Sequence, residues 1–346
     1  MNILLIKLSA IGDVVHTIPC LRALRICYPK AHITWVIEED ASDLIMNHSD
    51  CNRVLVSHRK RWLRNLKKRD SVSKTFMEIG SFLKSLRDRR YDMAIDFHGL
   101  FKSAVIMGVA RAKRKIGYRS MQELSGLFYN ETIPEDIKKH AVERYLDFIR
   151  YLGFPTNSPV FFMALRDDER KRAKSLLLEC GIDKKDPFVA INTVALWETK
   201  LWEDEKFSHL ADRIVSELDT KVVFTGGKEK ASVDKIISMM SKPAVNLAGR
   251  TTLRELACVY ESAEAVISTD SGPMHISAAV KTPTVALFGP TDPVRTGPYG
   301  EGHQIVRAGL PCSPCFLKSC TTRLCMEEIT VDTVFEAVKN VLAKKR

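Results

Sequence analysis

Asp13 is the residue whose type and position most directly suggest chemistry. It follows Gly12 in the segment Ser9-Ala-Ile-Gly12-Asp13, directly after the apolar run of residues 2–8. Such a run is typical of a buried parallel strand, and Gly12 permits a tight turn before the next helix. A carboxylate at the carboxyl end of a strand can act as a general base. The plainer interpretation is a helix cap; the spacing alone favours the cap, and the two roles are compatible.

Two further strand-to-helix turns lie in the second half of the chain. In Thr269-Asp-Ser-Gly-Pro-Met-His275, free N–H groups at a helix start would suit a diphosphate, although a plain turn capped by Asp270 or Ser271 fits equally well. In residues 192–202, Lys200 could neutralise a leaving phosphate and Thr193 could hydrogen-bond to one. The alternative there is a solvated loop with two packing tryptophans. No G-x-G-x-x-G or Walker A motif occurs, so a standard dinucleotide or P-loop site is not supported.

Four cysteines cluster near the C-terminus with the spacing Cys312-x2-Cys315-x4-Cys320-x4-Cys325. This spacing allows a zinc or iron–sulfur site but matches no standard zinc finger. The alternative, which the spacing favours, is a thiol-rich loop without metal. The other five cysteines are scattered, as buried small apolar residues would be.

The basic side chains gather in the first half of the chain. The net charge is +11; residues 1–155 carry 27 basic and 17 acidic side chains, against 26 and 25 in residues 156–346. The run 58–69 contributes most, with Lys102, residues 111–115 and Arg119 adding to it. Most charge runs are solvated faces, but this asymmetry favours a polyanionic partner: nucleic acid, an anionic membrane or an acidic substrate. No nucleic-acid-binding motif accompanies it.

The elements that must position these residues alternate between strand and helix in both halves. The expected strands are residues 2–8, 32–37, 53–56, 93–97, 188–192, 221–225, 245–247, 265–268 and 284–288. Helices are expected between most of them, over residues 141–152, and over Val331–Lys345 at the end. The pattern predicts an α/β protein with two doubly wound domains, residues 1–155 and 156–330, joined near the breaker-rich segment 153–159. Ligands bind such sheets at the carboxyl ends of the strands.

With these segments in view, the chain resembles family 9 of the glycosyltransferases, the bacterial lipopolysaccharide heptosyltransferases. The resemblance is carried by Ala195-x-Trp197-x-Thr199-Lys200-x-Trp202, Thr269-Asp-Ser-Gly-Pro-Met-His275 and Leu287-Phe-Gly-Pro-Thr-Asp-Pro293. The cysteine cluster also recurs in this family. The resemblance implies the GT-B architecture, in which two Rossmann-like domains face each other across a cleft.

The resemblance also implies the donor and the roles of particular residues. It implies ADP-L-glycero-β-D-manno-heptose as donor, bound by residues 156–330, with no cofactor. Residues implied near its diphosphate are Thr193, Lys200, Ser271, Gly272 and His275; Asp270 would contact the heptose hydroxyls and Glu229 the ribose. Asp13 would be the base of an inverting displacement, and Lys200 would stabilise departing ADP. Asn192 stands where the family often has Thr or Ser, which questions one phosphate contact.

The first half of the chain further resembles those family members that add the first heptose to Kdo of the inner core. The matching segments are residues 33–39, 61–62, 91–103, 127–130 and 140–144. The implied acceptor is Kdo-lipid A, an anionic glycolipid, and the acceptor-binding residues would be Gly12, Arg61, Arg64, Lys102, Arg119 and Arg144. No secretory signal or membrane-spanning run is visible, so a cytoplasmic protein peripheral to the inner membrane is expected. The alternatives are a later heptosyltransferase, a nucleic-acid-binding protein and a Rossmann oxidoreductase.

Overall fold

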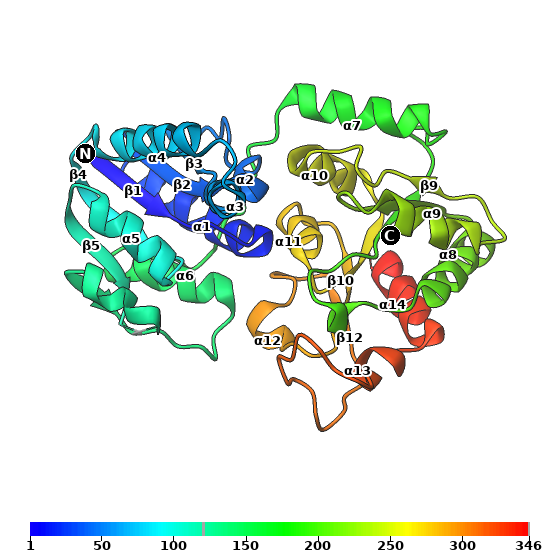
Figure 1. The fold of residues 1–346 in the computed structure, drawn as a ribbon. Helices are drawn as coiled ribbons and strands as arrows, with labels where there is room; N and C mark the ends of the chain where they lie inside the picture. Colours follow the sequence, from blue (N-terminus) through cyan, green and yellow to red (C-terminus); the bar gives the residue numbers. More distant parts are fainter. Residues whose placement is uncertain (120–121, 345–346) are drawn as a thin grey trace. The chain divides into compact units, whose positions relative to one another are not determined.

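The computed structural model describes residues 1–119 and 122–344 (Figure 1). The chain forms two compact units, residues 1–164 and 165–346, which are described separately below. The units therefore divide beyond the predicted boundary at 155/156, because residues 156–164 pack with the first unit; His48 Nε2, for example, lies 2.7 Å from the carbonyl oxygen of Phe162.

The first unit is built on a parallel sheet of six strands in the order β3-β2-β1-β4-β5-β6. The strands are β1 (Asn2–Ile6), β2 (His32–Glu38), β3 (Arg53–Ser57), β4 (Tyr91–Asp96), β5 (Ala112–Tyr118) and β6 (Glu131–Ile133). The central strands β1 and β2 are almost wholly buried, as expected for a parallel sheet covered by helices on both faces. In the register, Ile3 lies beside Ile33 on one side and beside Met93 on the other.

Helices connect and cover the strands of this unit. They are α1 (Ile11–Cys27), α2 (Glu39–Ser42), α3 (Arg59–Lys68), α4 (Val72–Arg87), α5 (Phe101–Val109), the 3-10 segment η1 (Gln122–Phe128) and α6 (Ala141–Tyr151). The α1 and α6 helices pack against each other, and the buried side chains of α6 follow a spacing of three and four residues. This packing brings Tyr145 of α6 to Asp13 in the first turn of α1.

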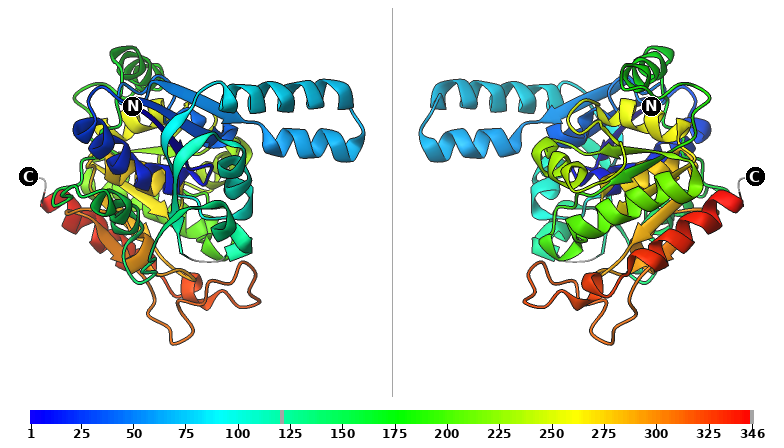
Figure 2. Two further views of the ribbon diagram at one scale, coloured as in Figure 1. Left: turned by 90° about the vertical axis from the view of Figure 1, so that its left-hand side faces the viewer. Right: turned by 90° about the vertical axis from the view of Figure 1, so that its right-hand side faces the viewer.

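The α3 and α4 helices form an antiparallel pair that extends away from the rest of the first unit (Figure 2). The α3 helix packs chiefly on α4, through the buried Trp62 and the indole–ring contact between Trp62 and Phe82. The two helices meet at residues 69–71, where Arg69 ends α3 in the left-handed conformation. We call residues 59–87 the α3–α4 arm.

The second unit has a parallel six-stranded sheet in the order β12-β11-β10-β7-β8-β9. Its strands are β7 (Phe188–Asn192), β8 (Lys221–Thr225), β9 (Val245–Asn246), β10 (Ala265–Thr269), β11 (Thr284–Leu287) and β12 (Gln304–Val306). Its helices are α7 (Asp167–Glu179), η2 (Glu198–Lys200), α8 (Asp204–Leu218), α9 (Lys230–Ser238), α10 (Leu253–Ser262), α11 (Gly272–Ala279), α12 (Pro293–Thr296), α13 (Leu324–Glu327) and α14 (Val331–Ala343). Residues 345 and 346, included in the predicted terminal helix, lie outside the described residues.

The two sheets have the same topology, which confirms the predicted class of two Rossmann-like α/β units. In each sheet the first strand of the unit lies next to the fourth, so the strand order reverses between β1 and β4 and between β7 and β10. Ligands of such folds bind at the carboxyl ends of the strands at this reversal. β5, β6 and β12 were not predicted from the sequence, because exposed or half-buried polar positions break their apolar pattern. In the described part of the chain, no helix is long and apolar enough to cross a membrane.

Candidate functional site

Asp13 lies in the first turn of α1, at the strand reversal of the first unit. The N-cap residue of α1 is Ala10, and not Asp13 as the sequence had suggested. Asp13 occupies the third helical position, where its Oδ2 accepts a hydrogen bond from the Ala10 N–H at 3.3 Å. A carboxylate there also benefits from the helix dipole. The Asp13 side chain is 40% exposed, and can therefore reach a substrate.

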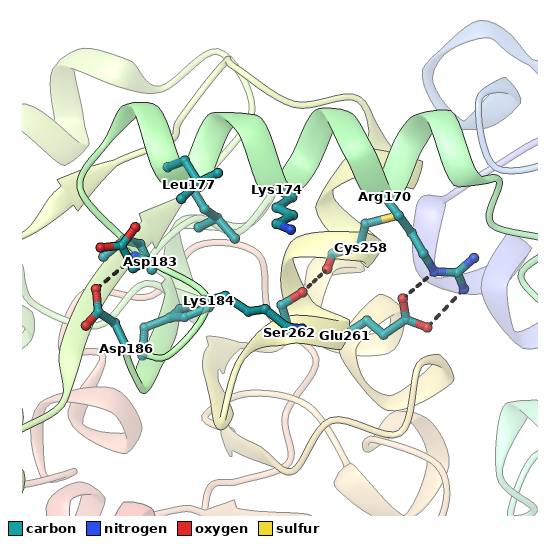
Figure 3. A pocket seen from close by; sticks show the side chains of 12 residues that line it. Arg170, Lys174, Leu177, Asp183, Lys184, Asp186, Cys258, Glu261 and Ser262 are labelled. Atoms are coloured by element: carbon teal, nitrogen blue, oxygen red, sulfur yellow. Dashed lines mark hydrogen bonds and ion pairs between the residues drawn. The ribbon is translucent and has the colours of Figure 1, made fainter.

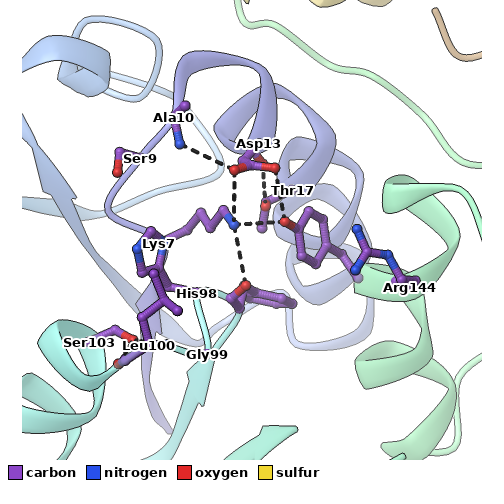
Figure 4. A network of polar contacts seen from close by, with 12 residues as sticks. Lys7, Ser9, Ala10, Asp13, Thr17, His98, Gly99, Leu100, Ser103 and Arg144 are labelled. Carbon is purple, nitrogen blue, oxygen red and sulfur yellow. Dashed lines mark hydrogen bonds and ion pairs between the residues drawn. The ribbon is translucent and has the colours of Figure 1, made fainter. Parts of the chain in front are cut away.

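Two buried side chains, those of Lys7 and Tyr145, contact the Asp13 carboxylate within the polar network of Figure 4. Lys7 follows β1, and its Nζ donates to the Tyr145 hydroxyl at 2.7 Å and lies 3.6 Å from Asp13 Oδ2. The Tyr145 hydroxyl in turn donates to Asp13 Oδ1 at 3.2 Å. Burial lowers the pKa of Lys7, while the nearby Asp13 and Asp96 carboxylates act in the opposite direction. Burial raises the pKa of Tyr145, so its proton stays available to Asp13.

The loop after β4 forms another wall of this site. Asp96 is fully buried and accepts hydrogen bonds from the N–H groups of His98 and Gly99 and from the Tyr129 hydroxyl, at 2.8, 3.2 and 2.8 Å. Burial, with the charges of Lys7 and Lys102, lowers the pKa of His98 to about 3. His98 is therefore a neutral ring beside Asp13 at ordinary pH.

Lys102, a predicted acceptor residue, reaches the same edge of the sheet from α5. Its Nζ lies 3.3 Å from Ser9 Oγ and 3.7 Å from Oε1 of the buried Glu38. Glu38 ends β2 and also accepts a hydrogen bond from Arg59 Nε at 2.9 Å. Burial lowers the pKa of Lys102, and the Glu38 charge opposes this effect. Glu38 thus links the root of the α3–α4 arm to the loop that precedes Asp13.

The other predicted acceptor residues are divided between this site and other places. Gly12 adjoins Asp13, and Arg144 lies beside Tyr145, where its charge acts on Lys7 and its Nη1 pairs with Glu135 at 2.8 Å. Arg61 and Arg64 lie along the α3–α4 arm; Arg61 pairs with Glu78 at 2.9 Å, and Arg64 is exposed. Arg119 is exposed beyond the end of β5.

The second unit gathers its predicted residues at the corresponding reversal between β7 and β10. Lys200 Nζ pairs with Asp270 Oδ2 at 2.6 Å, and the same oxygen accepts a hydrogen bond from Thr291 at 2.6 Å. The Asp270 side chain is 5% exposed and that of Lys200 15%. Lys200 Nζ also lies 4.5 Å from the centre of the Trp197 ring. Loops that follow β7, β10 and β11 therefore meet at one buried charged pair.

The start of α11 follows Asp270 in the chain, and the side chain of its N-cap residue makes no cap hydrogen bond to the helix N–H groups. Ser271 is the N-cap residue, but its hydroxyl bonds instead to Asn192 Nδ2 at 3.0 Å and to the Thr269 carbonyl. Asn192, which departs from the family pattern, thus organises this turn. Thr193 and His275 are buried, and both lie within a few residues of these strand ends in the sequence. Such a helix start attracts anions.

Glu229 follows β8, at the same edge of the sheet but one strand further out. It is the N-cap residue of α9, and its carboxylate packs on Gly227, where a Cβ atom would lie 3.1 Å from Glu229 Oε2. Glu229 has no described contact with the Lys200–Asp270 pair.

Cys312, Cys315 and Cys320 lie in the loop between β12 and α13, which contacts the Lys200 segment, and Cys325 lies in α13. All are free thiols; Cys312, Cys315 and Cys320 are exposed. The Thr199 hydroxyl donates to the Leu317 carbonyl at 2.8 Å, which joins this loop to the turn containing Lys200. Within the described part of the chain, no group of three or more His, Cys, Asp or Glu side chains is arranged to hold a metal ion.

A separate cavity of about 250 Å³ lies between α7 and α10 (Figure 3). Arg170 and Glu261 pair across its rim at 2.8 Å, and Cys258 lines it. Phe188, at the amino end of β7, also lines it, so the cavity lies away from the carboxyl ends of the strands. None of the predicted site residues contributes to it.

Sequence reasoning missed Lys7, Glu38, His98 and Tyr145. Lys7 and Glu38 carried a usable signal, because each is a charged residue at the end of an apolar strand, where a buried charge needs a partner. His98 follows a strand in the same way. Tyr145 gave no local signal, since it reaches Asp13 from 132 residues further along the chain.

Known proteins resemble this chain in sequence and in fold. Residues 79–325 match the sequence profile of the family described as glycosyltransferase family 9 (heptosyltransferase). Lipopolysaccharide heptosyltransferase 1 of Pseudomonas aeruginosa is 29% identical over 93% of this chain and 88% of its own length. Relatives described as lipopolysaccharide heptosyltransferase 2 and 3 match as well.

Solved structures share the fold over the whole chain. A family 9 glycosyltransferase of Veillonella parvula has a TM-score of 0.84 at 23% identity, covering 99% of this chain and 97% of its own. The E. coli heptosyltransferase WaaC, solved with ADP, has a TM-score of 0.78 at 24% identity, covering 99% and 100%.

Proposed function

We propose that this chain, which belongs to glycosyltransferase family 9 (the heptosyltransferases), transfers L-glycero-D-manno-heptose from ADP-heptose to Kdo of the lipopolysaccharide inner core. The proposal rests on one observation: each unit has the chemical groups needed for one half of the transfer. The first unit presents an accessible carboxylate, Asp13, held by Lys7 and Tyr145. The second presents a helix start suited to an anion, beside the partly exposed ammonium of Lys200.

The second unit is proposed to bind the donor. The N–H groups at Gly272 and beyond and the Lys200 ammonium would bind the diphosphate, with Thr193, Ser271 and His275 completing its surroundings. Asp270 would accept hydrogen bonds from the heptose hydroxyls, and Glu229 from the ribose. Because Asp270 already neutralises Lys200 at 2.6 Å, donor binding must divide the ammonium between carboxylate and phosphate.

The chemical step is proposed to be an in-line displacement with inversion. Asp13 takes the proton from the Kdo hydroxyl, whose oxygen forms the new bond to the anomeric carbon of heptose as the bond to the ADP oxygen breaks. The negative charge that develops on ADP is stabilised by Lys200 and the α11 amides. The Tyr145 hydroxyl and Lys7 keep the Asp13 carboxylate oriented towards the acceptor.

The first unit is proposed to bind an anionic acceptor at the cytoplasmic face of the inner membrane. The proposed acceptor-binding residues are Gly12, Arg61, Arg64, Lys102, Arg119 and Arg144. The excess of basic side chains in residues 1–155 supports this assignment, because Kdo carboxylates and lipid A phosphates are both negative. Arg144 is already paired with Glu135, so we expect it to orient the site more than to neutralise the ligand.

A transfer assay with mass detection tests the proposal. ADP-heptose is offered with Kdo-lipid A or with heptosyl-Kdo-lipid A, and we expect product only from the first acceptor. Product from the second alone would identify a later heptosyltransferase, the alternative favoured by the matches to relatives described as heptosyltransferase 2 and 3. No product from either acceptor would refute the proposed function.

A further inference from the structure

The α3–α4 arm carries more charge than the two proposed acceptor residues on it, Arg61 and Arg64, account for. Residues 59–87 contain ten basic and two acidic side chains. Near the root of the arm these charges are paired, as Arg59 is with Glu38 and Arg61 with Glu78. Towards the tip they are not: none of Lys67, Lys68, Arg69 and Lys74 lies within 4.0 Å of an acidic group among the described residues, and all are exposed.

Large apolar side chains are exposed on the same arm. Phe76 and Met77 are 60% and 68% exposed, although they lie only one to two turns from the tip. They share the outward face of α4 with Gly80, where an added Cβ atom would meet nothing within 4 Å. The face opposite, with Thr75 and Leu86, is the buried one. Most of the surface of Phe76 and Met77 is therefore left uncovered by the described residues of the first unit.

We propose that the tip of the α3–α4 arm, comprising Lys67, Lys68, Arg69, Lys74, Phe76 and Met77, binds the surface of an anionic phospholipid bilayer. Exposed lysines and arginines are attracted to anionic headgroups, and neighbouring apolar side chains enter the boundary between headgroups and acyl chains. Both kinds of side chain are exposed on one helical hairpin, whose projecting backbone is seen in Figure 2. A nucleic acid would match the charge, but the methionine and phenylalanine side by side favour lipid.

The inference deepens the proposed function, on which it rests for the choice of membrane. The arm would hold the enzyme at the bilayer that contains its acceptor. Its root is tied to the Asp13 site through the Arg59–Glu38 and Lys102–Glu38 contacts, at 2.9 and 3.7 Å. Bound at its tip, the arm would therefore set the distance between the lipid surface and Asp13.

Cosedimentation of the full-length protein with vesicles tests the proposal without donor or acceptor. The vesicles contain phosphatidylcholine alone or with phosphatidylglycerol, and we expect binding to the second kind, weakened by salt. At about fivefold in affinity for each lysine, the variant Lys67→Glu/Lys68→Glu/Lys74→Glu should lose at least about a hundredfold. The matched control Lys171→Glu/Lys184→Glu/Lys185→Glu makes the same change of charge at exposed positions of the second unit and should bind normally.

A second pair of variants tests the apolar component. Phe76→Ser/Met77→Ser should lose about tenfold or more in affinity for the anionic vesicles, whereas Ile26→Ser/Leu178→Ser, at exposed positions elsewhere, should not. All these substitutions are on exposed side chains, and circular dichroism melting verifies that the fold is kept. On an acceptor without acyl chains, the arm variants should keep the wild-type kcat/KM; on acceptor in vesicles, their KM should rise.

Several outcomes would overturn the proposal. Wild-type protein that ignores phosphatidylglycerol, or arm variants that bind vesicles as the wild type does, would refute it. Duplex DNA or single-stranded RNA bound more tightly than vesicles, and lost in the same arm variants, would assign the tip to nucleic acid. Failure of the proposed function is distinguishable, because transfer would then be absent in the wild type while the vesicle results hold.

Discussion

The Lys200–Asp270 ion pair allows the stability of the second unit and its proposed binding of ADP to be tested separately. Lys200→Met removes the ammonium 2.6 Å from a carboxylate that is 5% exposed and leaves the Thr291 hydroxyl as its described donor. Stranding one member of a buried ion pair costs about 3–5 kcal/mol, and the remaining hydroxyl places the expected cost at the lower end. Adding Asp270→Asn removes the stranded charge, so the double variant should regain about 2 kcal/mol.

Native-state hydrogen exchange is the suitable assay, because it reports opening of the second unit separately from the first. Amides of β7, β10 and β11 should exchange faster in Lys200→Met and return towards wild-type rates in the double variant. Lys235→Met serves as a control: Lys235 pairs with Asp204 at 2.9 Å on the surface, and its loss should leave these rates unchanged.

Affinity for ADP separates the structural role of Lys200 from the proposed donor role. Losing a charge-assisted hydrogen bond to the diphosphate should weaken ADP binding by about 10- to 100-fold in the single variant. The double variant should remain weak, since the ammonium is still absent although the unit is stable again. Recovery of ADP affinity in the double variant would show that Lys200 acts only through stability and would refute the reasoning.

Four further predictions concern the first unit. Asp13→Asn should reduce kcat by about 100-fold or more while ADP affinity stays constant, as measured by single-turnover kinetics and calorimetry. Lys7→Met should lower kcat by about tenfold without changing ADP affinity, because the carboxylate loses a fixed neighbour; an unchanged kcat would contradict this. The folded-state pKa of His98 is about 3, below the unfolded value of about 6.5, so its contribution to stability is present above pH 6.5 and is lost as pH falls towards 3; His98→Asn should flatten this acid dependence of hydrogen exchange. Gly117→Ala, whose methyl would lie 2.3 Å from an aromatic ring atom, should destabilise the unit by about 1–3 kcal/mol, whereas Gly80→Ala in open space should not.

The sequence sufficed to predict the fold class because both sheets contain strands that are buried over all or nearly all of their length. Residues 188–192, 221–225 and 265–268 are mainly apolar and are followed by polar turns, and the structure has strands there. β5 escaped detection because Lys113, Arg114 and Lys115 interrupt it, and their charges lie at solvent-facing positions of a strand that is paired on both sides. Pairing with neighbours, which a local pattern does not reveal, decides such strands.

The candidate site residues could be predicted where they directly follow a strand that the sequence itself predicts. Asp13, Asp270 and Lys200 all follow strands that meet at a strand reversal, and the structure brings Asp270 and Lys200 into contact. What escaped prediction depends on contacts between distant segments. The hydroxyl of Tyr145 reaching Asp13 is one example, and the pairing of Glu38 with Arg59 on the arm is another.

The shared strand order also determines when each unit can mature during synthesis. β1 finds its partner β4 only after some ninety residues have been made, as the pairing of Ile3 with Met93 requires. Lys7 must then wait for Tyr145, 138 residues downstream. A nascent chain therefore carries Lys7, which follows β1, without its hydroxyl partner until α6 has left the ribosome, and non-local pairing of this kind slows folding. The first unit can complete this step while the second is still being translated, because every strand of its sheet precedes residue 165.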